Sequence, residues 1–217
     1  MTAFQAFIFD LDGTLVDSEA LHFEAYHEVI EKYGGTLSRE EFIEWWLIKA
    51  KGMRWAIESQ KLVVDAAVAK LEKAQRFQTF LKEGVSVMPG VKKILDFAKR
   101  ENISLAVASG SRLEEVDAVL RASGLAEYFP VRFGLDSVKQ NKPDPEMFLA
   151  AAKQLGVTPD ECLVFENTPM GIEAARAAKM KCIAAPSRFT MGVDLSGADV
   201  LLRSLNEWTP EILRSRT

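Results

Sequence analysis

Four short segments of the chain are apolar at nearly every position. Because polar and apolar residues do not alternate within them, both faces of each segment are expected to be covered. This pattern predicts the strands of a parallel sheet that lies between two layers of helices. The segments are Phe7–Phe9, Leu105–Ala108, Cys162–Phe165 and Cys182–Ala185, and a fifth strand is expected at residues 198–202.

Helical segments with start and stop residues separate these strands. Ser111 followed by Glu114 has the spacing of a capping box, and glycines end the second and third helices. The alternation of strand and helix predicts an α/β fold, a doubly wound, Rossmann-like parallel sheet. The helices are expected to begin at Pro89-Gly90, Ser111, Asp144-Pro145 and Thr168-Pro169, and those glycines are Gly124 and Gly156.

Residues 18–84 break this rhythm and read as helical throughout. Ser38 and Glu41 offer a capping box. Apolar residues then recur at helical spacing, at Val64, Ala67, Val68, Leu71 and Ala74. We therefore expect a core made of residues 1–17 and 85–217, with residues 18–84 as an inserted helical cap. An insertion after the first strand would lie over the carboxyl ends of the strands, where open α/β sheets bind ligands.

Composition narrows the class of protein. The chain has 217 residues, of which 48% are hydrophobic and 27% charged, and a net charge of -4. No basic stripe suggests nucleic acid as a partner. We expect no signal peptide and no membrane span, and therefore a cytoplasmic protein, most simply a monomer. Cys162 and Cys182 are expected to be reduced and buried.

The strongest chemical signal follows the first strand, in the segment Asp10-Leu11-Asp12-Gly13-Thr14. Two carboxylates so close together repel each other when buried, and a bound cation would relieve that repulsion. Mg²⁺ prefers oxygen ligands and suits a phosphorylated substrate. Asp10 could attack phosphorus, and Asp12 could act as the general acid and base. Gly13 would allow the sharp turn that follows.

Three further segments carry candidate site residues at strand ends or helix starts. The Ser109 hydroxyl, with Gly110 and Ser111, could hold phosphate oxygens. Lys142, stiffened by the following proline, could stabilise negative charge beside Asp10. Glu166 and Asn167 end another buried strand, which is expected to lie next to the first. Their role as metal ligands beside Asp10 and Asp12 is implied by the family resemblance given next.

These motifs, in this order, resemble those of the haloacid dehalogenase-like superfamily, and the branch they resemble is that of β-phosphoglucomutase-like proteins and sugar-phosphate phosphatases. The resemblance implies the α/β fold, a small helical cap, Mg²⁺ and an aspartyl-phosphate intermediate on Asp10. The family usually has aspartate where Asn167 stands, so Mg²⁺ binding is expected to be weaker unless Glu166 compensates, and Asn167→Asp is expected to strengthen it. Glycine is more usual where Asn141 and Lys179 stand.

The cap is expected to select the substrate, because the chemistry of the core is generic. His22 stands where similar proteins have a histidine that faces the cap and could contact the substrate, although a histidine on a helix more often has a structural role. Lys51 and Arg54, with Lys49, form a basic cluster among tryptophans. That cluster could bind a second phosphate or a sugar, or it could be the solvated side of a packed aromatic group.

The sequence therefore predicts a Mg²⁺-dependent phosphatase that acts on a small phosphorylated metabolite, such as a sugar or polyol phosphate. Two alternatives stay open. One is a mutase similar to β-phosphoglucomutase, in which a sugar hydroxyl replaces water as the acceptor. The other is a binding protein with a weakened site, for which Asn167 is the argument.

Overall fold

A single parallel sheet forms the centre of the molecule. The computed structural model describes residues 4–213, and within them six strands lie in the order β3-β2-β1-β4-β5-β6. The predicted doubly wound α/β core is confirmed, because the chain starts in the middle of the sheet and adds strands on both sides. The strands are β1 Ala6–Phe9, β2 Ser104–Ala108, β3 Val131–Phe133, β4 Cys162–Glu166, β5 Lys181–Ala184 and β6 Val200–Leu201.

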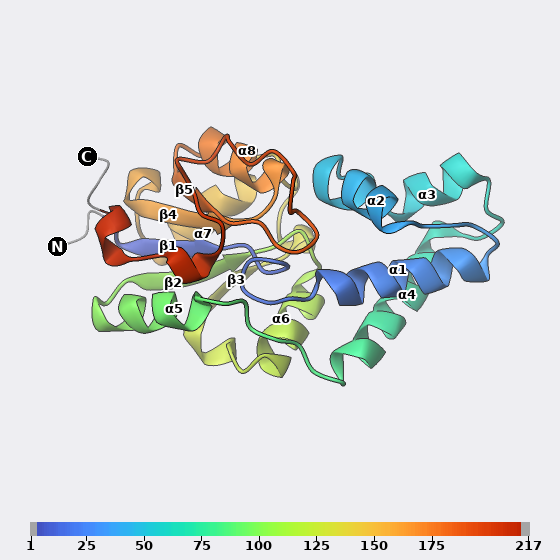
Figure 1. Ribbon diagram of the computed structural model, residues 1–217, viewed down its shortest axis with the longest axis horizontal. Coiled ribbons are helices and arrows are strands. Elements are labelled where there is room, and N and C mark those ends of the chain that lie inside the picture. Colours follow the sequence, from blue (N-terminus) through green and yellow to red (C-terminus); the bar gives the residue numbers. More distant parts are fainter. Residues whose placement is uncertain (1–3, 214–217) are drawn as a thin grey trace.

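Helices cover both faces of this sheet (Figure 1). On one face α5 and α6 pack against β1 and β2 around Phe7, Phe9 and Trp208. On the other face α7 and α8 pack on Ile8 and Val164. The central strands β1 and β4 therefore bury both faces, as their unbroken apolar runs require. The helices are α5 Val91–Arg100, α6 Leu113–Ala122, α7 Glu146–Leu155 and α8 Pro169–Ala177.

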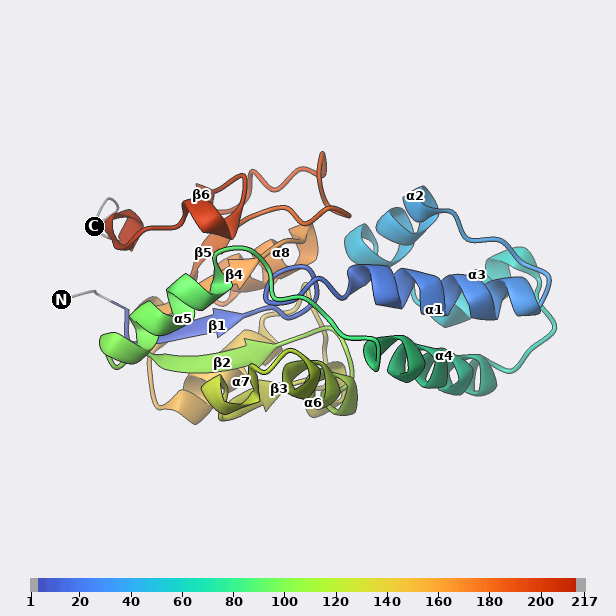
Figure 2. The same ribbon diagram turned by 60° about the horizontal axis from the view of Figure 1, so that its bottom comes forward.

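Residues between β1 and α5 form a separate helical group beyond the carboxyl ends of the strands (Figures 1 and 2). The group has its own apolar cluster around Val29, Phe42 and Met53. The capping box of Ser38 and Glu41 is present, as predicted. Its helices are α1 Glu19–Lys32, α2 Arg39–Phe42, the π-helix η1 Ile43–Ile48, α3 Met53–Gln60 and α4 Ala66–Leu81.

Two connecting segments join this group to the sheet, and they lie side by side. Val16 pairs with Val87 in an antiparallel bridge, and the Asp17 amide donates to the Ser86 carbonyl at 2.9 Å. The sheet domain also contacts the helical group through Phe189, which follows β5 in the sequence and packs in the apolar cluster of the helical group. The division of the chain at residues 17/18 and 84/85 remains a prediction.

The apolar stripe predicted for α4 is not the face that α4 packs inward. The buried residues of that helix are Ala69, Lys73, Phe77 and Leu81, which also recur at helical spacing. Leu71 is 62% exposed. The apolar spacing therefore predicted correctly that this segment is helical, but it did not predict which face of the helix is buried.

Two predicted helix starts differ in detail. Helix α6 begins at Leu113 after Arg112, and the expected capping box from Ser111 is wrong, because the Ser111 hydroxyl bonds Asp12 instead. Helix α7 begins one residue later than expected, after Pro145, with Asp144 accepting from the Glu146 amide at 2.9 Å.

Other composition-based expectations can be compared with the described residues. Cys162 and Cys182 are both free and buried, as predicted. In residues 4–213, no helix combines the length and apolar character needed to cross a membrane.

Candidate active site

The carboxyl ends of β2, β1 and β4 bring the predicted residues together. Asp10 follows β1, Ser109 follows β2, and Glu166 is the last residue of β4. These three strands are neighbours and run in parallel, so their ends meet at one edge of the sheet. Lys142 reaches the same edge from the loop before α7.

Lys142 joins the two carboxylates nearest to it. Its ammonium nitrogen lies 2.7 Å from Asp10 Oδ1 and 2.6 Å from Glu166 Oε1. Burial by itself would lower the pKa of Lys142, but the two carboxylates outweigh burial and hold that pKa above its usual range. Lys142 is therefore a fixed positive charge beside Asp10, as the sequence predicted.

Asp10 lies in a position that disfavours an ionised carboxylate. It is 7% exposed. Burial, together with the charges of Glu166 and Asp12, raises the pKa of Asp10 to about 8, although Lys142 opposes the rise. An additional positive charge near Asp10 would favour the ionised, nucleophilic form.

The surroundings of Asp12 shift its pKa in the opposite direction from that of Asp10. Its Oδ1 accepts from the Ser18 hydroxyl and lies 3.1 Å from His22 Nε2. Its Oδ2 accepts from Ser111 at 2.8 Å and from Ser109 at 3.3 Å. Burial would raise the pKa of Asp12, but His22 and the hydroxyl donors outweigh it and hold that pKa well below its usual range. Asp12 is therefore a carboxylate when no ligand is bound.

Glu166 is fixed through its second oxygen. Oε2 accepts from the Asn167 amide at 2.9 Å and from the Thr168 amide and hydroxyl at 3.1 and 3.0 Å. These amides come just before α8, whose N-cap is Thr168, so the carboxylate lies near the positive end of that helix. A Cβ at Gly171 would lie 1.8 Å from Glu166 Oε1, so only glycine leaves room for this arrangement.

Asn167 faces a carboxylate that sequence reasoning missed. Asn167 Oδ1 accepts from Thr14 at 3.1 Å, and Nδ2 donates to Glu19 Oε1 at 2.8 Å. Glu19 is 1% exposed, and burial raises its pKa to about 8. A Cβ on Gly13 would lie 2.3 Å from Asn167 Nδ2, which explains the glycine beside them. The only feature of the sequence that could have pointed to Glu19 is its place as an acidic residue in the first turn of α1.

A cavity of about 960 Å³ opens between the strand ends and helices α1 to α4. Asp10, Asp12 and Lys142 line its floor, with His22, Gly110 and Ser111 at its side. The opposite wall carries Tyr26, Phe42, Trp46, Leu47, Met53 and Leu71. The helical group also contributes polar lining residues, Lys70, Lys73, Gln75, Gln78, Thr79 and Lys82. The cavity therefore combines charged groups at the strand ends with a mixed aromatic and polar surface.

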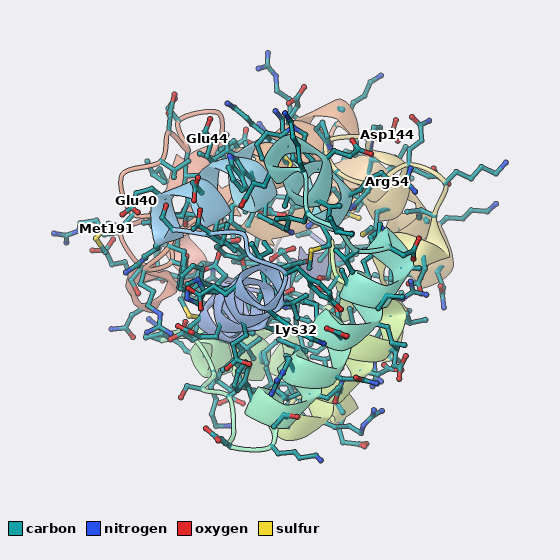
Figure 3. The ribbon with its side chains drawn as sticks, turned by 90° about the vertical axis from the view of Figure 1, so that its right-hand side faces the viewer. Lys32, Glu40, Glu44, Arg54, Asp144 and Met191 are labelled. Atoms are coloured by element: carbon teal, nitrogen blue, oxygen red, sulfur yellow. The ribbon has the colours of Figure 1, made fainter. Side chains whose placement is uncertain are left out.

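Lys51 and Arg54 are not among the residues that line this cavity. The Lys51 ammonium lies 4.3 Å from the centre of the Trp55 ring, and Trp55 packs edge-to-face on Trp45. Arg54 is exposed and lies on the face of the molecule seen in Figure 3. This arrangement matches the alternative in which cations lie on the solvated side of an aromatic group, and the substrate role of Lys51 and Arg54 remains a prediction.

Comparison with known proteins gives the family. The sequence model of one protein family, the haloacid dehalogenase-like hydrolases, matches residues 7–185 of this chain. The chain belongs to this family. The match contains all four of the segments described above, from Asp10 to Asn167.

Relatives of this hydrolase family cover most of the chain. A phosphorylated carbohydrates phosphatase from Thermotoga maritima is 37% identical, over 82% of this chain and 83% of its own. The fructose-1-phosphate phosphatase YqaB from Escherichia coli is 34% identical, over 81% and 93%. A crystal structure of a CbbY variant from Rhodobacter sphaeroides in complex with xylulose-(1,5)bisphosphate has a TM-score of 0.85 at 32% identity, and covers 95% of this chain and 96% of its own.

Phosphatases of the haloacid dehalogenase-like family generally use Mg²⁺. The described residues contain no cluster of three or more His, Cys, Asp or Glu side chains arranged as a metal site. Mg²⁺ is usually held by only one or two carboxylates, with water and substrate phosphate supplying the rest. Asp10 and Glu166 contact the Lys142 ammonium group, and the charge of Asp12 also acts on Asp10. The donor set therefore has the oxygen chemistry and the excess negative charge that suit the ion.

Proposed function

We propose that this protein hydrolyses a small phosphorylated sugar or polyol, with Mg²⁺ as its cofactor and Asp10 as the nucleophile. The enzyme class is that of the phosphoric monoester hydrolases, to which phosphatases among its relatives belong. One observation carries the proposal most directly. Lys142 bridges Asp10 and Glu166 at the charged end of a cavity large enough for a sugar phosphate.

The reaction has two steps on the residues of this chain. An Asp10 oxygen attacks phosphorus, the bond from phosphorus to the sugar oxygen breaks, and Asp12 gives a proton to that oxygen. Asp12 then takes a proton from water, which attacks the phosphoryl group and releases phosphate and free Asp10. Lys142 stabilises the negative charge that the phosphoryl oxygens carry in both steps.

The hydrogen bonds of Asp12 explain how it can act first as an acid. Ser109 and Ser111 donate to Asp12 in the ligand-free site, and this donation helps keep it ionised. A bound phosphoryl group would accept these hydroxyls instead. The pKa of Asp12 would then rise towards the range in which a carboxyl group can donate a proton.

Oxygen atoms of Asp10, Asp12, Glu166 and Asn167 are the candidate ligands of Mg²⁺. When bound, the ion supplies positive charge that favours ionised Asp10 and neutralises the phosphoryl oxygens. Asn167 contributes a carbonyl oxygen but no charge. Its present bonds to Thr14 and Glu19 hold the amide in one orientation.

The substrate class rests on the relatives and on the shape of the cavity. The two phosphatases are named for a phosphorylated carbohydrate and for fructose 1-phosphate, and the crystal structure contains a sugar bisphosphate. The aromatic residues Tyr26, Phe42 and Trp46 opposite the carboxylates give an apolar surface against which the carbon skeleton of a sugar can pack.

The test is a phosphate-release screen over sugar phosphates, polyol phosphates and sugar bisphosphates, each with Mg²⁺ and with EDTA. We expect release that requires Mg²⁺ and that Asp10→Asn abolishes. Mutase activity would instead convert β-glucose 1-phosphate to glucose 6-phosphate when a bisphosphate primer is present. Binding of sugar phosphates without release at saturating Mg²⁺ would contradict the proposal and favour the binding-only alternative.

A further inference from the structure

A line of buried polar contacts runs from helix α6 to Asp12. Lys73 on α4 is 5% exposed, and its ammonium nitrogen lies 2.8 Å from Glu115 Oε1. The same nitrogen lies 2.9 Å from His22 Nδ1. His22 Nε2 lies 3.1 Å from Asp12 Oδ1. The contacts thus run in space from Glu115 on α6 through Lys73 on α4 and His22 on α1 to Asp12 in the loop after β1.

This line fixes the tautomer of His22. An ammonium group has only hydrogen atoms to donate, so His22 Nδ1 must accept from Lys73. The ring proton of neutral His22 is therefore on Nε2, where it donates to Asp12. The other tautomer would direct a ring N–H at an ammonium group and a lone pair at a carboxylate, which is unfavourable at both ends.

Aromatic contacts fix the orientation of the same groups. The His22 ring stacks on Phe77 with 4.0 Å between ring centres and 16° between planes. The Lys73 ammonium lies 4.8 Å from the centre of the Phe77 ring and 5.0 Å from that of Tyr26. Burial would lower the pKa of Lys73, but Tyr26 and Glu115 outweigh burial and raise it, which keeps the ammonium form.

We propose that Glu115 is a positioning residue for Asp12, acting through Lys73 and His22. Glu115 lines the cavity, and its described side-chain contact is with Lys73 rather than with Asp10 or Asp12. It holds Lys73 at the distance at which Lys73 sets the His22 tautomer, and His22 in turn orients the Asp12 carboxylate for proton transfer. The proposal rests on the proposed function, in which Asp12 is the general acid and base.

The same contacts also favour one placement of the helical group. Lys73 and His22 belong to α4 and α1, whereas Glu115 belongs to α6 beside the sheet. The line is complete only when these helices lie against each other. A buried ion pair is weak evidence for stability by itself, so a role as a simple anchor must be distinguished by experiment.

The kinetic test compares two substrates in the Glu115→Gln variant. General acid assistance matters for an alkyl leaving group and little for p-nitrophenol, which leaves readily as an anion. We expect kcat/KM, which reports the steps up to release of the leaving group and not the later attack of water, to fall about tenfold for fructose 1-phosphate or the sugar phosphate of the screen that is hydrolysed fastest. This is a fraction of the roughly 10² to 10⁴ typical of acid–base assistance. For p-nitrophenyl phosphate the loss should stay below about twofold. Glu115→Asp, which keeps the charge, should recover part of the loss.

Asp117→Asn is the matched control. Asp117 lies on the same helix, and its substitution removes the same charge and an ion pair with Arg132, 2.8 Å long, away from the cavity. This variant should keep the leaving-group dependence of the unmodified protein. In an Asp12→Asn background, Glu115→Gln should cause no further loss on the sugar phosphate.

A spectroscopic measurement tests the same proposal without turnover. The chain has only two histidines, so the ring ¹⁵N signals of His22 and His27 can be assigned with one His27→Gln variant. We expect His22 to be the Nε2–H tautomer in the unmodified protein and a mixture in Glu115→Gln. An unchanged tautomer, or an equal loss of kcat/KM on both substrates, would overturn the positioning role. Absence of turnover with a changed tautomer would contradict the proposed function but support the link from Glu115 to His22.

Discussion

The contact between Asn167 and Glu19 reverses the expectation that aspartate at position 167 would improve the metal site. The Asn167 amide donates to Glu19 Oε1 at 2.8 Å, and both side chains are buried. Aspartate would place a second carboxylate at that distance. At an effective dielectric constant of about 20, two unit charges so close repel by about 6 kcal/mol.

The variant would relieve this repulsion by holding one proton between the two carboxyl groups. A shared proton raises one pKa strongly in the folded state, so the stability of Asn167→Asp should be highest at low pH and be lost as the pH rises through that pKa. We expect a loss of about 2 kcal/mol or more at pH 8, which for a chain of this length lowers Tm by about 4–8 °C. At pH 5 the loss should be small.

Mg²⁺ binding should follow the same logic. In Asn167→Asp the added charge is neutralised by the proton or opposed by Glu19, so the Mg²⁺ concentration for half-saturation should not fall. In Asn167→Asp with Glu19→Gln, the amide and the carboxylate exchange places and the net charge is that of the unmodified protein. We expect this double variant to bind Mg²⁺ about tenfold more tightly than Asn167→Asp, a difference of about 1.4 kcal/mol.

Thermal unfolding in EDTA and calorimetric titration with Mg²⁺ measure the two effects independently of turnover. Asn206→Asp is the control, because it adds the same charge at an exposed position. Tighter Mg²⁺ binding in Asn167→Asp alone, with Tm unchanged at pH 8, would refute the coupling between residues 167 and 19.

Three further outcomes follow from single substitutions. Asp10→Asn should abolish phosphate release while circular dichroism and Tm stay close to those of the unmodified protein, because Lys142 keeps Glu166 as a partner. Glu19→Gln should stabilise the metal-free protein, because the pKa of Glu19 is about 8 when folded against an ordinary value of 4.5. Since a raised carboxyl pKa costs stability only as the pH rises, the gain in Tm should be absent near pH 4.5, grow up to pH 8 and then level off. Lys179→Gly should raise the free energy of unfolding by up to about 1 kcal/mol in denaturant titration, because residue 179 has φ of +61°.

The central strands could be predicted from the sequence because burial on both faces leaves an unbroken apolar run. β3 could not, since it has three residues, lies at the edge of the sheet and contains Arg132. Arg132 is tied to Asp117 and to the Phe129 carbonyl rather than being buried among apolar side chains. Edge strands lack the pattern that identifies central ones.

The motifs at the strand ends were predictable for a similar reason. Chain direction alone places the ends of parallel neighbours at one edge, so Asp10, Ser109 and Glu166 had to converge. The partners that hold them were not predictable. Glu19 and Asn167 are 148 residues apart in sequence, and Lys73 and Glu115 are 42 apart. Such contacts depend on how the helices pack in three dimensions, and short sequence motifs carry no information about that packing.

Lys73 shows why the orientation of α4 was also missed. A helix normally buries its apolar stripe, and a lysine on the buried face argues against that face. Here the buried face contains Lys73 because Glu115 and His22 satisfy its ammonium group. The apolar residues Ala67, Leu71 and Ala74 line the cavity instead. Lys73 lines the same cavity, so the side of α4 that faces the substrate combines these apolar residues with the lysine that contacts His22.

The two carboxylates after β1 are two residues apart, yet the site shifts their pKa values in opposite directions. Asp10 is surrounded by carboxylates with one ammonium group, so its pKa is raised, whereas Asp12 receives four donors and its pKa is lowered. Opposed shifts of this kind divide chemical roles between similar groups. Asp10 needs an added cation to become a nucleophile, and Asp12 needs to lose donors to become an acid. A phosphorylated substrate that arrives with Mg²⁺ would bring both changes at once, so the ligand-free site is kept unreactive by the same contacts that prepare it.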